Sequence, residues 1–132
     1  MVLVDTNVLV DVLQNDPQWA DWSIAQMRAQ ASIQPLAINP VIYAEISLSF
    51  STLEALERAV TVLALELREI PRPALFLAAK AFAQYRRRGG ARQQVLPDFF
   101  IGAHAATQGW PLLTRDASRF RSYFPSLEVL SP

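Results

Sequence analysis

Short apolar runs alternate along the chain with longer stretches in which apolar residues recur every three or four positions. The first run, Val2-Leu3-Val4, is β-favouring and ends at Asp5, which predicts a buried strand with a carboxylate at its carboxyl end. Similar runs predict strands over 34–38, 65–70, 110–114 and 127–130. The strand over 65–70 is expected at an edge of the sheet, because prolines follow it.

The stretches with helical spacing have recognisable start and stop residues. Thr6 or Asn7 is expected to cap the first helix. Asn39-Pro40 is a strong start for another helix, with proline at its first position. The predicted helices cover residues 8–13, 17–31, 40–48, 52–63, 74–88, 96–108 and 117–121.

This order of elements predicts the fold class. Strands separated by helical segments of crossover length form parallel sheets with helices on both faces. We therefore expect a three-layer α/β/α protein with a central parallel sheet of about five strands. The length of 132 residues fits a single domain over 1–132. If the first strand is central, Asp5 lies where the strand order reverses, which is where open α/β sheets bind ligands.

Composition excludes several classes of protein. Apolar residues make up 52% of the chain and charged residues 18%, as in globular proteins. There is no cysteine, which excludes disulfides and thiolate metal sites and is in keeping with a cytoplasmic protein. We expect neither a signal peptide nor a membrane partner, because no basic segment precedes the first apolar run and no run could span a bilayer. Formal net charge is zero, so nucleic-acid binding would need a local patch.

Four carboxylates occupy positions that such a fold would bring together. Asp5 and Asp116 end two predicted strands, and Asp98 opens a helix directly after a Leu-Pro step. Glu45 lies on or beside the apolar face of its helix, where an unpaired charge is costly. The other acids, Asp11 among them, are expected at caps, exposed helical positions or strand ends.

Each of these acids also has a structural interpretation. Asp98 and Asp116 could cap or charge the first turns of helices, and Glu45 could reach solvent or pair with an arginine. Taken together, they form a set of hard oxygen ligands suited to Mg²⁺ or Mn²⁺. A divalent ion held this way supports hydrolysis of a phosphodiester bond.

Other chemistries fit the sequence less well. The single histidine, His104, is expected to be a packed or surface helix residue. With no cysteine and only this histidine, the sequence argues against a nucleophilic triad. Phosphotransfer to Asp5 would need a nearby lysine, but Lys80 lies mid-helix among alanines. A non-catalytic binding module of the same fold stays open as an alternative.

Arginines provide the one basic concentration. The run consists of Arg86, Arg87 and Arg88, with Arg92 close by. It can be a solvated helix end that complements the helix dipole, or it can hold an RNA backbone without reading its sequence. Arg115, beside Asp116, is a second candidate for RNA binding.

Four motifs, in order and spacing over nearly the whole chain, resemble the PIN-domain family and more narrowly the bacterial VapC-type toxins. They are Val-Asp-Thr-Asn-Val-Leu-Val-Asp at 4–11, Ala-Glu-Ile at 44–46, Leu-Pro-Asp-Phe-Phe-Ile-Gly-Ala-His-Ala at 96–105 and Leu-Leu-Thr-Arg-Asp at 112–116. The resemblance implies a compact α/β/α ribonuclease fold that uses Mg²⁺ or Mn²⁺.

The resemblance also assigns site residues. The family's acids correspond to Asp5, Glu45, Asp98 and Asp116, which would be both catalytic and metal-binding. The supporting polar residues correspond to Thr6, Asn7 and Thr114. Some members carry a further acid one turn after the third. This chain has Gly102 there and so lacks that ligand for a second metal.

Partners follow from the same resemblance. VapC-type toxins act on RNA, form homodimers and are silenced by a VapB-like antitoxin whose tail covers or enters the acidic groove. An amphipathic antitoxin segment is a candidate for a groove between the second and fourth helices. Residues that either line that groove or belong to the core are Trp19, Trp22, Leu53 and Leu56. The alternative within the fold is a housekeeping nuclease that processes RNA or DNA without an antitoxin.

Overall fold

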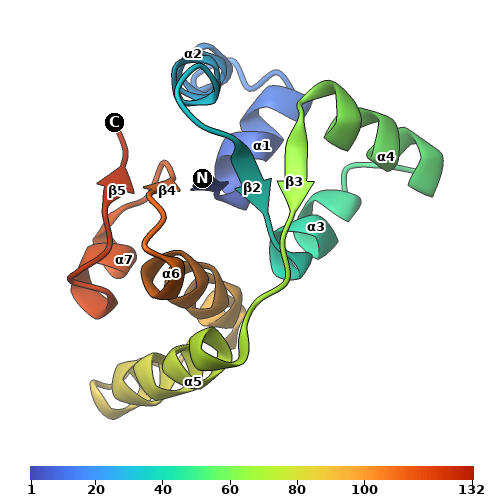
Figure 1. The fold of residues 1–132 in the computed structure, drawn as a ribbon. Helices are drawn as coiled ribbons and strands as arrows, with labels where there is room; N and C mark the ends of the chain where they lie inside the picture. Colours follow the sequence, from blue (N-terminus) through green and yellow to red (C-terminus); the bar gives the residue numbers. More distant parts are fainter.

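The computed structural model describes residues 1–132 as one parallel sheet of five strands with helices around it (Figure 1). The strands are β1 (Val2–Val4), β2 (Leu36–Ile38), β3 (Leu65–Leu67), β4 (Leu112–Leu113) and β5 (Val129–Leu130). The helices are α1 (Thr6–Leu13), α2 (Ala20–Ala31), α3 (Pro40–Ser47), α4 (Leu53–Val62), α5 (Arg72–Arg87), α6 (Leu96–Gln108) and α7 (Ser118–Tyr123), with a 3₁₀ turn η1 (Gln93–Val95) before α6.

Strand β1 is central, and the order across the sheet is β3-β2-β1-β4-β5. The chain moves outward from β1 to β2 and β3, then crosses back to β4 on the other side of β1. Because the order reverses there, the carboxyl end of β1 opens onto the crevice in which such sheets bind ligands. Asp5 follows β1 directly, and its backbone N–H donates to the Leu113 carbonyl of β4 at 2.9 Å.

Helices cover both faces of the sheet, so the three-layer α/β/α fold is confirmed. Right-handed crossovers in a sheet whose order reverses place α1–α4 and α5–α7 on opposite faces. Helices α5 and α6 pack side by side, away from α2 and α4 (Figure 1). None of the helices is long and apolar enough to cross a bilayer.

The strands are shorter than the apolar runs predict, because prolines and partner lengths limit pairing. Pro35 and Pro111 have no N–H to donate, and only their carbonyls accept bonds, from Val2 and Leu3 respectively. Strand β3 stops at Leu67 because its neighbour β2 ends at Ile38 and the next residue already caps α3. The sheet therefore has a narrow, fully paired centre.

Three helix starts differ from the sequence prediction by two residues or more; α5 begins at Arg72, and the other two are set by aspartates. Asp5 itself caps α1, accepting the Thr6 N–H at 2.7 Å, so the helix begins at Thr6 and not two residues later. Asp16 and Pro17 begin a turn, not a helix: Asp16 Oδ1 accepts the N–H groups of Gln18 and Trp19, and α2 starts at Ala20. At Asp5 and at Asp16 a local hydrogen bond to the aspartate side chain decides the boundary.

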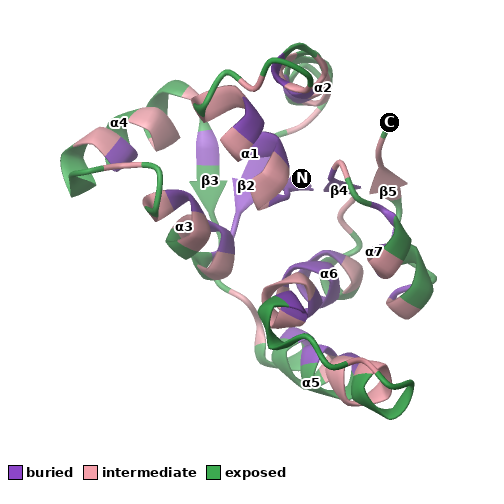
Figure 2. Cartoon of the chain, turned by 180° about the vertical axis from the view of Figure 1, so that it is seen from behind, coloured by how far each residue is buried: buried purple, intermediate pink, exposed green.

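An aromatic cluster joins α5, α6 and α7. Phe99, fully buried on α6, lies 5.4 Å from the Phe82 ring and 5.3 Å from the Tyr123 ring between centroids. Tyr85 and Phe124 complete the cluster. Much of α6 is buried, whereas the loop after α5 is exposed (Figure 2). This packing fixes the start of α6, where Asp98 lies.

Gly102 faces this aromatic cluster from α6. A Cβ atom at this position would lie 2.5 Å from Cε2 of Phe124 and 3.0 Å from Cδ1 of Phe120. Both rings are buried, so neither is free to move aside. The glycine therefore has a packing reason, and no acidic side chain fits there without displacing Phe124.

We predict that Gly102→Ala destabilises the fold by about 1–2 kcal/mol. Alanine alone would favour the helix by about 1 kcal/mol. Overpacking a tight core costs about 1–3 kcal/mol, and the 2.5 Å approach to Phe124 places this cost in the upper half of that range. Urea unfolding measures the difference. The substitution is expected to cost less in a Phe124→Leu background, where the ring is absent. Equal stability of the parent and the single variant would contradict the prediction.

Candidate functional site

A cleft of about 330 Å³ lies at the carboxyl ends of β1 and β4. The four predicted acids all line it, although they come from four separate segments of the chain. The complete lining is Asp5, Thr6, Asn7, Val10, Glu45, Asp98, Arg115, Asp116 and Phe120. The cleft thus holds four carboxylates and one guanidinium group, which makes it an acidic site.

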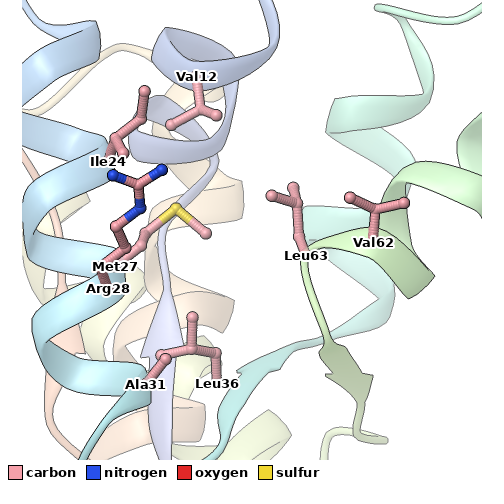
Figure 3. Close-up of a pocket in the computed structure, with 8 residues that line it drawn as sticks. All are labelled: Val12, Ile24, Met27, Arg28, Ala31, Leu36, Val62 and Leu63. Atoms are coloured by element: carbon pink, nitrogen blue, oxygen red, sulfur yellow. The ribbon is translucent and has the colours of Figure 1, made fainter.

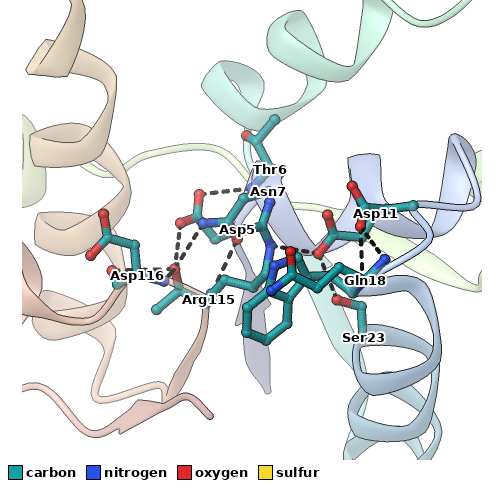
Figure 4. Close-up of polar contacts among 11 residues, drawn as sticks. Asp5, Thr6, Asn7, Asp11, Gln18, Ser23, Arg115 and Asp116 are labelled. Atoms are coloured by element: carbon teal, nitrogen blue, oxygen red, sulfur yellow. Dashed lines mark hydrogen bonds and ion pairs between the residues drawn. The ribbon is translucent and has the colours of Figure 1, made fainter.

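Asp5 is the most buried of the four acids, with 5% of its surface exposed. Its Oδ1 accepts the Thr6 N–H at 2.7 Å, and its Oδ2 accepts the Thr114 hydroxyl at 2.8 Å. The Asn7 amide in turn donates to Thr114 Oγ1 at 3.3 Å (Figure 4). The three supporting residues expected from the sequence therefore all surround Asp5.

Glu45 reaches the cleft from α3, one side of which is buried. Its Oε1 accepts the Thr6 hydroxyl at 2.6 Å, so the interpretation as an arginine partner is wrong. Helix α3 is held by Asn39, whose Oδ1 caps Ile42 N–H and whose amide donates to Nδ1 of His104 at 3.2 Å. This buried contact connects the helix that carries Glu45 to the helix that carries Asp98.

His104 is a packed residue, which is one of the two structural roles that the sequence predicts for it. Its ring is buried and lies 5.2 Å from that of Trp110. Burial lowers the pKa of His104 to about 4, because the charged imidazolium would lose its hydration. His104 is therefore neutral near pH 7 and does not line the cleft.

Asp98 and Asp116 lie at the more open side of the cleft. Asp98 Oδ2 accepts a bond from Nη1 of Arg119 at 2.7 Å, a partner that the sequence analysis missed. Arg119 lies on α7, three residues after Asp116. This spacing was the signal that Arg119 would lie near the cleft. Asp116 is exposed, and its carboxylate accepts only the Ser118 hydroxyl, at 3.2 Å. Neither aspartate serves as a helix N-cap.

The pKa of Asp5 is raised to about 7. Desolvation by burial is the largest cause, and the negative charges of Asp98 and Glu45 raise it further, against the hydrogen bonds from Thr114 and Thr6. Burial also raises the pKa of Asp98, which Arg119 opposes. A buried carboxyl with this shift, beside other acids in a cleft, is typical of a functional site.

The sequence matches the model of the PIN domain over residues 2–123. The chain belongs to the PIN domain family. A search of the curated proteins gives no match. The family predicted from the motifs is therefore confirmed.

Solved structures share the fold of this PIN domain. VapBC2 from Rickettsia felis, bound to a DNA fragment from the promoter, has a TM-score of 0.77 at 18% identity, covering 100% of this chain and 99% of its own. VapBC-1 from nontypeable Haemophilus influenzae has a TM-score of 0.74 at 18% identity, covering 99% of this chain and 98% of its own. FitAcB from Neisseria gonorrhoeae has a TM-score of 0.70 at 21% identity, covering 98% of this chain and 96% of its own. At 18–21% identity, these likenesses show a shared fold.

The acids of this PIN domain suit a hard cation by chemistry. No group of three or more Asp, Glu or His side chains is arranged, as it stands, to hold a metal ion. Two features keep these carboxylates apart. Their negative charges repel one another, and each of three acids already accepts a hydrogen bond: Glu45 from Thr6, Asp5 from Thr114 and Asp98 from Arg119. The donor set fits Mg²⁺ or Mn²⁺, and the side chains would have to converge further to hold it.

Arg115 lines the cleft but turns its side chain toward α1 and α2. Its Nε donates to Asp11 Oδ2 at 2.6 Å, and its backbone N–H donates to Asn7 Oδ1 at 3.3 Å. Asp11 is buried, so the expectation that it occupies an ordinary exposed position is wrong. Its place one helical turn after Asn7, on the same side of α1, was the signal for this contact.

The predicted basic run lies apart from the cleft. Arg86, Arg87, Arg88 and Arg92 are all exposed, and none of them lines the acidic site. The Arg88 guanidinium lies 5.1 Å above the Tyr123 ring. Lys80 is also exposed, with its ammonium 5.0 Å above the Phe76 ring. The lysine that phosphotransfer to Asp5 would require is therefore absent from the site.

A second, apolar groove of about 350 Å³ lies between α2 and the end of α4 (Figure 3). Its lining is Val12, Ile24, Met27, Arg28, Ala31, Leu36, Val62 and Leu63. The groove lies between the helices predicted from the sequence, but none of the four residues proposed for it contributes. Leu56 belongs to the core, Leu53 points to solvent, and Trp19 packs under the Arg115 guanidinium.

We predict that Asp5→Asn stabilises the metal-free protein at pH 8 and not at pH 4. The folded pKa of about 7 exceeds the ordinary 3.8, so the folded state retains a proton that the unfolded state releases. The contribution of the Asp5 carboxyl to the free energy of unfolding is fully present below pH 4 and is lost as pH rises through 7. The amide cannot ionise, so the variant should gain roughly 2–4 kcal/mol at pH 8.

Urea unfolding in EDTA at both pH values measures this difference. Asp21→Asn, which changes an exposed acid on α2, is the control for loss of a charge. A gain of the same size at pH 4 and pH 8 would show that the raised pKa of Asp5 is not its cause.

Proposed function

We propose that this PIN domain is a metal-dependent endoribonuclease that hydrolyses RNA phosphodiester bonds. The observation that carries the proposal is the convergence of Asp5, Glu45, Asp98 and Asp116 in one cleft at the switch point of the sheet. Oxygen-only ligand sets of this kind suit Mg²⁺ or Mn²⁺. A non-catalytic module would have no reason to keep four carboxylates together at an energetic cost.

The four acids would hold the ion, and each has a distinct setting. When bound, a divalent ion activates water for attack on phosphorus and neutralises charge on the phosphate. Asp5 must lose its proton to act as a ligand, and Thr114 holds its Oδ2 in a fixed direction. Thr6 links α1 to Glu45 through its hydroxyl and to Asp5 through its backbone, so both carboxylates keep one orientation.

Asp5→Asn and Glu45→Gln are expected to lower Mn²⁺-dependent RNA cleavage on the order of 100-fold or more, since each removes a ligand charge. Purified protein is incubated with total RNA, and new ends are mapped. EDTA should abolish cleavage by the parent, and excess Mn²⁺ should restore it. Asp21→Asn serves as the matched control with unchanged activity. Cleavage by Asp5→Asn at the parent rate would refute the mechanism.

We further propose that the chain is the toxin of a VapBC-type pair. The solved structures that share its fold include VapBC and FitAB complexes, and the apolar groove offers a place for an amphipathic antitoxin segment. Expression should arrest growth, and a VapB-like protein encoded alongside should relieve the arrest. A housekeeping nuclease would have no such neighbour. Sedimentation tests the homodimer, which stays a prediction.

Val62→Glu is expected to weaken antitoxin binding at least about tenfold, because it places a charge in an apolar contact. Val62 is 82% exposed, so the fold should tolerate the change. Calorimetry with the purified antitoxin measures affinity, and RNA cleavage should stay unchanged. Leu48→Glu, at a residue 90% exposed and outside the groove, is the control. If both variants bind like the parent, the antitoxin docks elsewhere.

A further inference from the structure

Asp11 is a buried acid that the proposed chemistry does not use. Only 2% of its surface is exposed, and it does not line the cleft. Its Oδ2 accepts two bonds, from the Ser23 hydroxyl at 2.9 Å and from Arg115 Nε at 2.6 Å (Figure 4). A buried carboxylate is costly unless it is paired, so its presence calls for a role in holding Arg115.

Arg115 is fixed on two sides and free on a third. Asp11 binds Nε, and the Trp19 ring lies under the guanidinium at 5.2 Å. Nε makes the only hydrogen bond of this guanidinium within the chain, so the Nη1 and Nη2 groups have no protein acceptor. The side chain is 30% exposed and borders the acidic cleft. Two free, parallel N–H donors are the arrangement that binds a phosphate in bidentate fashion.

Without Asp11, the Arg115 guanidinium would have other carboxylates to pair with. Asp116 is its neighbour in sequence, and Asp5 lines the same cleft. Figure 4 shows the side chain running away from Asp116 and toward Asp11. Arg119 demonstrates the alternative, since it pairs directly with the cleft acid Asp98. An arginine paired in that way has its donors engaged within the protein, so they are not available to a ligand.

We propose that Arg115 binds a phosphate of the RNA backbone at the edge of the cleft, and that Asp11 is the positioning residue that keeps its guanidinium available. This inference rests on the proposed ribonuclease function. An acidic cleft repels RNA, and a single fixed guanidinium beside it supplies the attraction that places the strand. Asp11 does not touch RNA; it acts through Arg115.

Binding of a short single-stranded RNA of mixed sequence to the full chain tests this. Ca²⁺ replaces Mn²⁺ to suppress cleavage, and affinity is measured over a range of salt concentrations. Arg115→Gln is expected to weaken binding about tenfold and to lower the salt slope by about one phosphate contact. Asp11→Asn should give a similar loss and a similarly reduced slope, which a merely structural defect would not produce.

Coupling and folding controls complete the experiment. Asp11→Asn should have no further effect in the Arg115→Gln background. Arg68→Gln removes an equally charged but exposed arginine outside the cleft and should bind like the parent. If Asp11→Asn does not fold, Trp19→Leu tests the same positioning, because it removes the ring under the guanidinium.

Each outcome separates this inference from the proposed function. A parent protein that neither binds nor cleaves RNA overturns the ribonuclease assignment itself. A parent that cleaves RNA while Arg115→Gln binds normally overturns only the phosphate contact. Loss of binding in Arg115→Gln with normal binding in both Asp11→Asn and Trp19→Leu overturns the positioning role.

Discussion

Asp5 loses most of its hydration because β1 is buried in the middle of the sheet, and the surrounding elements replace that hydration only in part. Thr114 and the Thr6 backbone donate to its two oxygens, while Glu45 and Asp98 add negative charge nearby. The raised pKa records this imbalance. A central strand that ends in an acid therefore produces a site that attracts cations, and the rest of the cleft is arranged around it.

Two arginines border this cleft, and the fold treats them differently. Arg119 on α7 neutralises part of the charge of Asp98, at the open side where solvent screens the pair. Arg115 is instead drawn toward Asp11 and Trp19, away from the cleft acids. An ion that approaches Asp98 must compete with Arg119, whereas a phosphate that approaches Arg115 has no internal competitor at Nη1 and Nη2. One arginine thus neutralises a cleft acid, whereas the other, four residues earlier, is held away from the cleft acids.

Local patterns were sufficient to predict the central strand, the parallel sheet and the four acids that line the cleft. Strand ends and helix starts are short-range features, and an open α/β sheet gathers them at one edge. Asp11 and Arg119 escaped prediction because their ion-pair partners are distant in sequence. Arg115 lies 104 residues after Asp11, and Asp98 lies 21 residues before Arg119. The sequence left groove lining and core packing open for Leu56 and Trp22. Apolar spacing shows that these residues face inward, but it does not say whether another helix already covers them.

Helix α1 connects the two surfaces to which function is attributed. Its first turns place Thr6, Asn7 and Val10 in the acidic cleft, and Val12 near its end lines the apolar groove. A helix of eight residues is about 12 Å long, a span that four extended residues of a bound partner would cover. A partner segment that extends about four residues beyond the groove would therefore reach Arg115 and the carboxylates. One partner can then occupy the groove by apolar contact and the cleft by charge, and α1 fixes the distance between the two contacts.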